Sequence, residues 1–312
     1  MAGLLVLNEA DVRRALDLDE LAESLRAALI ALSAGSVSVP PRIGARSPSG
    51  LLGAMPGYVA GVGLAAKLVS VYPLNPERGR PAHQAIIAVF DEETGAPRAV
   101  MGATFITAMR TAMTSALATR ALARPQSAAL AVIGSGVQAD AHITALTRLM
   151  DMEDIRVASR NQSKATQLAS RYPKARAMGS VMEAVEGADV VCCCTGADEP
   201  VLRDEWIGPG THVGSVGSGA ELPDGLVRRS RVFVESRAAT APPPAGALEL
   251  QGVDAASLEE IGSVLAGRSA GRTTADEITV FKSTGHAAED VAAAAVVLRA
   301  ADRAGLGTTV PI

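Results

Sequence analysis

The spacing of apolar side chains divides the first third of the chain into helical and extended stretches. Residues 10–34 carry apolar side chains at helical intervals, with Asp19 and Glu20 near the start of a second helix. Residues 91–95 resemble a hairpin turn between two apolar runs. Apolar runs predict strands at residues 51–52, 65–72, 85–90 and 99–101.

The rest of the chain has a different pattern, in which short apolar runs alternate with helical stretches. An alanine-rich helix is predicted over residues 104–123, and it stops at Pro125. The alternation that follows is typical of a doubly wound parallel sheet. Its strands are predicted at residues 129–133, 155–159, 189–194, 211–215, 231–234 and 278–282. The last stretch, 287–304, predicts a helix that is apolar on most faces, so we expect it to pack at an interface.

The turn after residues 129–133 carries the first chemical signal. It reads Gly134-Ser135-Gly136-Val137-Gln138-Ala139, between an apolar strand and a helix that leads to the next strand. Glycines let the backbone turn sharply and approach a pyrophosphate, and the helix N-terminus offers unpaired N–H groups. The sequence therefore predicts a nicotinamide or flavin nucleotide here, and a structural glycine-rich turn is the alternative.

The end of the second strand bears on which nucleotide binds. An Asp or Glu at this place usually holds the ribose 2′-hydroxyl of NAD, but this chain has Ser159-Arg160-Asn161. A guanidinium can pair with a 2′-phosphate that a carboxylate would repel. We therefore predict NADP, with NAD as the alternative. If Arg160 has only a structural role, it is a solvated residue at the start of a helix.

Composition and charge argue against several other classes of function. The chain has 312 residues, 48% of them hydrophobic and 20% charged, which fits a compact enzyme of two domains. A net charge of −4 and an aromatic fraction of 3% give no reason to expect nucleic acid or an acidic membrane. We find neither a signal peptide nor a long apolar run, so we expect a soluble, cytoplasmic protein.

The residues that most often bind metals are poorly arranged for it. The three cysteines are consecutive, Cys192 to Cys194, and neighbouring strand residues point to opposite faces. The four histidines show no metal-binding spacing. We predict no metal site and interpret the cysteines as small buried side chains of a central strand.

Three cations stand where charge is otherwise scarce. Arg42 follows two prolines, Lys67 lies inside an apolar strand, and Arg110 lies near the start of the alanine-rich helix. A lysine in a buried strand rarely lacks a partner. Each cation alone is more often structural, but together they predict a pocket for a substrate carboxylate, which arginine binds bidentately.

These pieces together resemble the ornithine cyclodeaminase/mu-crystallin family over essentially the whole chain. The matching segments are Pro41-Arg42, Met55-Pro56, Lys67 to Pro73 with Asn75, residues 91–95, Thr107 to Ala112, Gly134 to Gln138, Gly210 to His212, Glu221-Leu222, Val280 to Gly285 and Glu289-Asp290. Members of the family use NAD(P) and handle α-amino acids, their imines or cyclic ketimines. They include ornithine cyclodeaminases, an alanine dehydrogenase, ketimine reductases and the mu-crystallins of the lens.

The resemblance implies an α/β protein with a Rossmann doubly wound sheet and an α+β substrate and dimerisation domain. The first would cover residues 123–286, and the second residues 1–122 and 287–312. The family's carboxylate-binding cations correspond to Arg42, Lys67 and Arg110, and Lys67 is the candidate catalytic residue. Its cofactor contacts correspond to Thr111, Gly134, Ser135, Gly136, Val137, Gln138, Ser159, Arg160, Thr195, Val216, Gly217, Ser218, Lys282 and Ser283.

Two departures from the family pattern bear on the substrate. Ornithine cyclodeaminases have an aspartate at or near the position of Gly219, in a stretch that is several residues shorter in this chain. They also have an acidic residue before the Met-Pro pair, where this chain has Gly53. Without those carboxylates the distal ammonium of ornithine has no evident partner, and a buried unpaired charge costs several kcal/mol.

We therefore expect an NAD(P)-dependent oxidoreductase acting on the C–N bond of a small α-imino or α-amino acid. In this hypothesis Lys67 is a proton donor or only a carboxylate ligand. One alternative is an ornithine or lysine cyclodeaminase, which releases ammonia with a recycled NAD. Another is a binding protein of the mu-crystallin type without useful catalysis. We also expect a homodimer built through the N-terminal domain, because the apolar C-terminal helix and the strands at 65–72 and 85–90 offer more apolar surface than a small domain covers alone.

Overall fold

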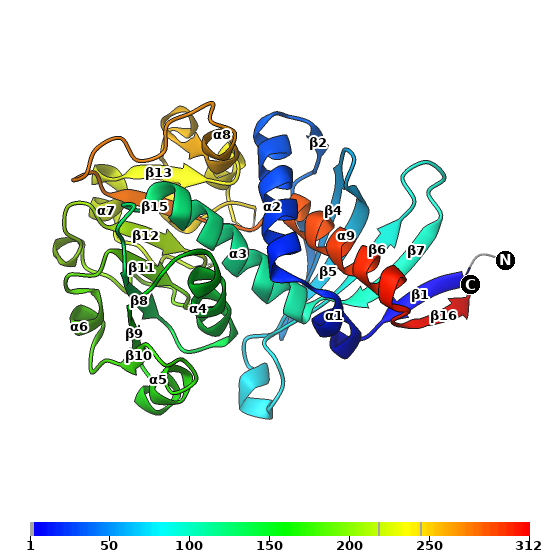
Figure 1. Ribbon diagram of the computed structural model, residues 1–312, viewed down its shortest axis with the longest axis horizontal. Coiled ribbons are helices and arrows are strands. Elements are labelled where there is room, and N and C mark those ends of the chain that lie inside the picture. The colour runs from blue at the N-terminus through cyan, green and yellow to red at the C-terminus, as the bar shows by residue number, and fades with distance from the viewer. Residues whose placement is uncertain (1–2, 218, 244) are drawn as a thin grey trace. The chain divides into compact units, whose positions relative to one another are not determined.

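The computed structural model describes residues 3–217, 219–243 and 245–312. The chain forms two compact units, whose elements are labelled in Figure 1. Unit 1 comprises Met1–Arg110 and His286–Ile312, and unit 2 comprises Thr111–Gly285. The division falls inside helix α3 (Thr104–Leu122). Each unit has its own sheet.

Unit 1 is built on one mixed sheet. Among the described residues its strands follow the order β16-β1-β7-β6-β5-β4-β2, and β3 also pairs with β4. β1 is parallel to β7, and the other neighbours are antiparallel. The strands are β1 (Gly3–Leu7), β2 (Val37–Ser38), β3 (Ile43–Ser47), β4 (Gly50–Val59), β5 (Gly63–Val71), β6 (His83–Phe90), β7 (Pro97–Gly102) and β16 (Thr308–Pro311).

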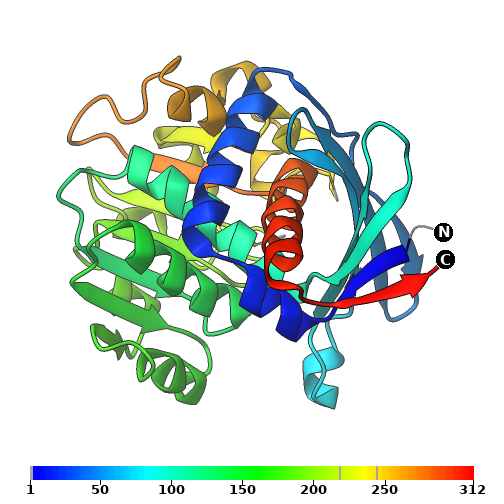
Figure 2. The ribbon, with the colours of Figure 1, turned by 45° about the vertical axis from the view of Figure 1, so that its right-hand side comes forward.

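One face of this sheet is covered by helices of the same unit. Helix α9 (Ala287–Ala304) packs on β4 and β5, with α1 (Glu9–Ala15) and α2 (Leu18–Ser33) beside it (Figure 2). Gly57 permits the close approach of α9, because a Cβ there would lie 3.2 Å from the Cβ of Ala287. The expectation that the C-terminal helix packs at an interface is therefore wrong. Its apolar faces are buried inside unit 1, and an apolar pattern cannot tell these two kinds of burial apart.

The structure confirms the two helices predicted within residues 10–34. α1 ends at Ala15, and Asp17 then caps α2 by accepting hydrogen bonds from the backbone N–H groups of Asp19 and Glu20. A carboxylate at this position also favours the helix dipole. Polar residues at the break, not the apolar spacing, set the boundary.

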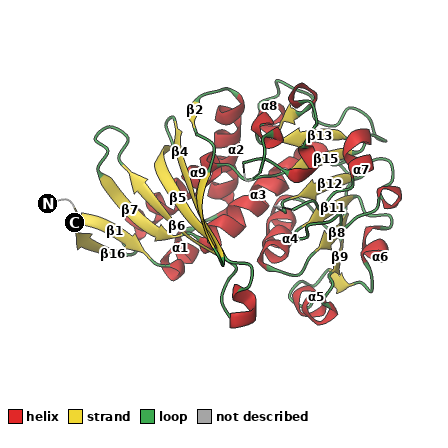
Figure 3. Ribbon diagram, turned by 180° about the vertical axis from the view of Figure 1, so that it is seen from behind, coloured by secondary structure: helices red, strands yellow, loops and turns green. Residues whose placement is uncertain are grey.

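Unit 2 is a parallel sheet with helices on both faces (Figure 3). Its strand order in the described residues is β10-β9-β8-β11-β12-β15-β13-β14. The strands are β8 (Ala129–Ile133), β9 (Asp154–Ala158), β10 (Ala175–Ala177), β11 (Val190–Cys193), β12 (His212–Ser215), β13 (Arg231–Val234), β14 (Glu259–Glu260) and β15 (Thr279–Lys282). The helices are α4 (Val137–Leu149), α5 (Gln162–Ala169), α6 (Val181–Val185), α7 (Asp224–Arg229) and α8 (Ile261–Leu265). Strand order reverses between β8 and β11, which is where such sheets bind ligands.

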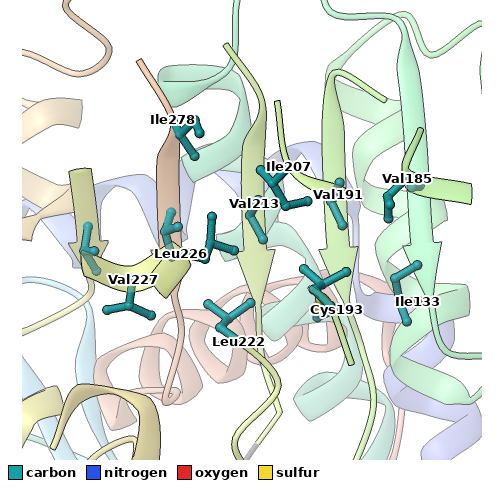
Figure 4. Packing of buried hydrophobic residues seen from close by; sticks show 14 of the residues in the cluster. Ile133, Val185, Val191, Cys193, Ile207, Val213, Leu222, Leu226, Val227 and Ile278 are labelled. Atoms are coloured by element: carbon teal, nitrogen blue, oxygen red, sulfur yellow. The ribbon is translucent and has the colours of Figure 1, made fainter. Parts of the chain in front are cut away.

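The core of unit 2 lies between the sheet and its covering elements. Figure 4 shows Ile133, Val191, Cys193 and Val213 from three neighbouring strands in one apolar cluster. All three cysteines are buried and unbridged, and burial raises the pKa of the Cys192 thiol to about 12. The prediction that they act as small buried side chains is confirmed.

The predicted fold class, a Rossmann doubly wound sheet with a second α+β unit, is confirmed. In the described ranges, no helix has the length and apolar content needed to span a membrane.

Candidate functional site

A buried cluster of four charged side chains forms the first candidate site, inside unit 1. We call Lys67, Arg110, Glu289 and Asp290 the charged cluster; all four are less than 9% exposed. Lys67 Nζ on β5 lies 2.8 Å from both carboxylate oxygens of Asp290 in the first turn of α9. Arg110 on α3 donates from Nε to Asp290 at 3.0 Å and from Nη1 to Glu289 at 2.8 Å. The shared carboxylate of Asp290 thus brings together two of the three predicted cations.

The surroundings of Lys67 lower its affinity for a proton. Burial is the largest cause and the Arg110 charge the second, while Asp290 and Glu289 act in the opposite direction, and the pKa of Lys67 falls to about 8. Burial alone would raise the pKa of Asp290, but Lys67 and Arg110 outweigh it and hold that pKa below its usual value. Lys67 can therefore gain or lose a proton close to neutral pH.

Arg42 belongs to the same unit and the same sheet. It comes one residue before β3, whose Ile43 pairs with Ala54, and the neighbouring Met55 pairs with Lys67. Since side chains alternate along a strand, Arg42 falls on the face of the sheet that carries Lys67 and α9. It is partly exposed, unlike Lys67 and Arg110. The role of these cations in binding a carboxylate remains a prediction.

The glycine-rich turn forms the second candidate site, in unit 2. Gly134 has φ of 129°, and a Cβ there would lie 2.6 Å from the carbonyl oxygen of Cys194, so only glycine fits. The turn therefore packs against the end of β11, at the point where strand order reverses. Gly136 is the N-cap of α4 and supplies no side-chain cap, and the space next to it is open. Unpaired N–H groups at the start of this helix are suited to an anion.

The end of β9 is linked to this turn. The Ser135 hydroxyl donates to the Ser159 hydroxyl at 2.9 Å, and the backbone N–H of Asn161 donates to the same oxygen. Ser159 can then donate its own hydrogen to a ligand. Arg160 is exposed beside it, and Val137 is 69% exposed on the first turn of α4. Gln138 is partly buried, and its backbone carbonyl contacts His142 Nδ1 at 2.7 Å.

Several other predicted cofactor contacts are engaged by buried carboxylates. Thr195 donates to Glu221, Lys282 Nζ donates to Glu249 at 2.9 Å, and the Ser283 hydroxyl donates to Glu235. Gly217 N–H also donates to Glu221. Val216 is partly buried, and Thr111 is buried at the start of unit 2. Ser218 lies outside the described residues.

The sequence alone predicted no role for these three carboxylates. Glu221, Glu235 and Glu249 are all at most 7% exposed, and each accepts hydrogen bonds at the carboxyl edge of the sheet. The sequence signal that could have identified them is an acidic residue close to an apolar run, as in Glu221-Leu222. This pattern is not specific, because it also occurs on exposed turns.

No group of potential metal ligands gathers anywhere in the described ranges, and two histidines are clearly structural. Burial lowers the pKa of His142 to about 4 and that of His212 to about 3, so both stay neutral. A cavity of about 590 Å³ in unit 2, lined by Arg120, Arg124 and Arg272, lies at the amino ends of the strands. The glycine-rich turn lies at the opposite edge of the sheet, so this cavity is not part of either candidate site.

The family assignment rests on a match from residue 4 to residue 304, which spans both candidate sites. The chain belongs to the ornithine cyclodeaminase/mu-crystallin family. The resemblance stated from the motifs is therefore confirmed.

Three relatives illustrate the range of the family. The chain is 39% identical over 254 residues to the ketimine reductase mu-crystallin of Mus musculus, with 80% of each chain covered. It is similar to the Δ1-pyrroline-2-carboxylate reductase of Thermococcus litoralis solved with NADH and L-proline (34% identity, TM-score 0.93, 98% and 99% of the two chains). It is also similar to an archaeal alanine dehydrogenase dimer with bound NAD (29% identity, TM-score 0.90, 99% of both chains).

The two departures from the cyclodeaminase pattern differ in structure. A Cβ on Gly219 would lie 1.9 Å from the carbonyl oxygen of Ala197, so this backbone has no room for any side chain there. A Cβ on Gly53 would meet Val69 at 3.5 Å, an ordinary contact. An aspartate at position 219 would thus require the loop to move, whereas a side chain at position 53 would not.

Proposed function

We propose that the chain is an NAD(P)-dependent oxidoreductase that reduces a small α-imino acid at its C=N bond, or oxidises the matching amino acid. The observation that supports this most directly is the charged cluster, in which Lys67 and Arg110 are buried and held by Asp290. The named activities of the relatives point in the same direction. The nicotinamide would supply or accept the hydride at the substrate carbon.

The protein's own groups would bind and orient the substrate. Arg42 and Arg110 would hold its carboxylate, and Lys67 would either add to this grip or give a proton to the imine nitrogen. The Lys67 ammonium, with a pKa near 8, is suited to proton transfer at neutral pH. Holding two reactants in a fixed geometry lowers the barrier by up to about 7–11 kcal/mol. The open N-terminus of α4 and the glycines of its turn fit a pyrophosphate.

The absence of a carboxylate at Gly219 and Gly53 argues against the ornithine cyclodeaminase alternative. The ammonium of a diamino acid would need a carboxylate partner, and neither Gly219 nor Gly53 supplies one. We therefore propose a substrate whose side chain carries no cation.

One panel of activity assays distinguishes the reductase, the cyclodeaminase and the binding protein. NADPH and NADH oxidation would be followed with pyrroline-2-carboxylate, piperideine-2-carboxylate, and pyruvate with ammonia or methylamine. Consumption of the reduced nucleotide supports the reductase. Release of ammonia from ornithine without net nucleotide turnover would instead establish a cyclodeaminase, and nucleotide binding without any turnover would favour a binding protein.

We extend the proposal to NADP as the preferred nucleotide, on the basis of Ser159 and the exposed Arg160. A charge-assisted contact is worth about 1.5–3 kcal/mol, or roughly ten- to a hundredfold in affinity. Arg160→Asp should reverse the preference toward NADH, and Arg156→Gln on the same strand serves as a control that should not. Equal affinities for the two nucleotides in the parent protein would contradict the assignment.

The outer face of the unit 1 sheet supports a homodimer. Ile43, Leu68 and Ile86 are 70%, 38% and 45% exposed, and they belong to one row across β3, β4, β5 and β6 in which Ala54 is the β4 member. A second copy of the chain would cover this apolar row, as symmetric oligomers do. Leu68→Asp should yield a monomer by light scattering. A parent protein of 31.8 kDa at micromolar concentration would overturn the proposal.

A further inference from the structure

The carboxylate of Glu221 joins two loops at the carboxyl edge of the unit 2 sheet. It is fully buried, and each of its oxygens serves one loop. Oε1 accepts from the backbone N–H and the hydroxyl of Thr195, both at 2.6 Å, directly after β11. Oε2 accepts from the Ser215 hydroxyl and the Gly217 N–H, both at 2.7 Å, at the end of β12. One side chain therefore sets the spacing between two strand ends.

The local sequence is adapted to this arrangement. A Cβ on Gly217 would lie 2.4 Å from Cδ of Glu221, so glycine makes the approach of the carboxylate feasible. A second layer holds Glu221 in place, because its backbone N–H donates to Glu249 Oε1 at 2.8 Å. Lys282 donates to that same oxygen and to the Gly217 carbonyl. Both carboxylate oxygens of Glu221 are fully engaged in this buried network, which favours a rigid arrangement of the two loops.

The position of these loops connects the network to the nucleotide. Thr195 follows Cys194, and the Cys194 carbonyl is the group against which Gly134 of the glycine-rich turn packs. β8 and β11 are the strands between which the order reverses, so their ends border the crevice where a nucleotide binds. Glu221, itself fully buried, thus holds the end of β11 next to the turn.

We propose that Glu221 is a positioning residue that preorganises the nucleotide crevice by fixing the loops after β11 and β12. The inference rests on the proposed function, since it takes the ligand to be NAD(P). Without Glu221 the loops would populate other arrangements, and apparent affinity falls with the population of the binding-competent one. The chemistry of the reaction would be unaffected once nucleotide is bound.

Glu221→Gln is the informative substitution. Glutamine has nearly the same size, but its NH₂ group would face two of the four donors, so one of the two loops would be released. We expect the Kd of NADPH, measured by its fluorescence, to rise about tenfold. We expect kcat at saturating nucleotide to stay within about twofold of the parent.

Asp189→Asn provides the matched control. Asp189 accepts from the N–H groups of Ala128 and Ala129 and from Arg124, just before β11 at the amino edge of the same sheet. Both variants should lower the melting temperature, but only Glu221→Gln should raise the nucleotide Kd. Should Glu221→Gln fail to fold, Ser215→Ala, which removes one donor, should still raise the Kd by about threefold.

The outcomes separate the two proposals. A parent protein that binds neither NADPH nor NADH would overturn the proposed function and this inference with it. A parent that binds nucleotide, with Glu221→Gln and Ser215→Ala both within twofold of its Kd, would leave the function standing and overturn the positioning role. An equal rise in Kd for Asp189→Asn would also overturn it, because general destabilisation would then explain the effect.

Discussion

Lys67 and Lys282 are both almost fully buried, but their surroundings differ in kind. Lys67 in unit 1 is held by charged side chains from α9 and lies close to the guanidinium of Arg110. Lys282 in unit 2 donates to a hydroxyl, a backbone carbonyl and one carboxylate. A ligand carboxylate could compete with the carboxylates around Lys67. Lys282 is held in part by the backbone carbonyl of Gly217, which a ligand group cannot replace.

The comparison suggests two uses for a buried charge. In the charged cluster two cations balance two carboxylates, so a bound substrate carboxylate would shift this charge balance and with it the pKa of Lys67. In the Glu221 network the charges hold loops at fixed positions. We expect substitutions in the first to change reaction rates and substitutions in the second to change nucleotide affinity.

The largest effect should come from Arg110→Ala. It would remove a proposed carboxylate ligand and also leave Glu289 and Asp290 with too little positive charge. We expect kcat/KM to fall by about a hundredfold, with little change in nucleotide Kd. The free energy of unfolding should fall by about 3–5 kcal/mol, because breaking a buried ion pair strands a charge.

Arg110→Lys separates the loss of activity from the loss of stability. It keeps the positive charge and so should recover most of the stability in chemical denaturation, but not the bidentate grip on a carboxylate. A variant Arg110→Ala that melts earlier yet keeps its activity per folded molecule would show that Arg110 only ties α3 to α9.

The pH dependence of kcat/KM for reduction should show a smaller effect. Lys67 carries its proton below its pKa of about 8, so the rate should fall about tenfold per pH unit above that value if Lys67 is the proton donor. Arg110 lowers this pKa, while Asp290 and Glu289 raise it. Partial burial, and to a smaller extent the charge of Lys67, lower the pKa of His83 on β6.

Asp290→Asn sharpens this test. It removes a charge that raises the Lys67 pKa, so the fall in rate should begin at lower pH, by about one unit. A pH profile without a fall up to pH 9 would identify Lys67 as a carboxylate ligand only.

The smallest effect should come from Ser215→Ala in the Glu221 network. The variant loses the hydrogen bond that Ser215 donates to Glu221 and the one that it accepts from Lys282, which should together cost about 2 kcal/mol of stability, or roughly 4–8 °C in melting temperature. At saturating nucleotide its kcat should match the parent. A loss of kcat as large as that of Arg110→Ala would show that the two networks do not have separate uses.

The sequence predicted the sheet of unit 2 closely, because buried parallel strands are short apolar runs. Residues 129–133 and 231–234 have the predicted bounds, and the other central strands differ by one or two residues. The two helices within residues 10–34 were also predicted correctly, because the acidic residues near the start of the second helix are a local signal. The C-terminal helix was predicted correctly as a helix and wrongly as an interface, since periodicity shows that a helix is apolar and not what covers it.

Within the candidate sites the sequence predicted roles for cations and glycines and none for the carboxylates, although Glu221 and Glu289-Asp290 lie in segments that match the family. Lys67 was conspicuous because a cation in an apolar strand is rare, and Gly134 because of its motif. Glu221 and Glu249 are ordinary residues in the sequence and become notable only through their burial. The partners of Lys67 and Arg110 lie about 180 residues or more away along the chain.

The amino-acid sequence by itself determined the strand-turn-helix unit and the family, because both depend on local spacing and on residue type. Only the tertiary structure decided that Asp290 joins Lys67 to Arg110, that Glu221 joins two loops, and that Gly219 has no room for a side chain. These are close approaches between segments distant in sequence. Their energies depend on burial and distance, and no local pattern encodes either quantity.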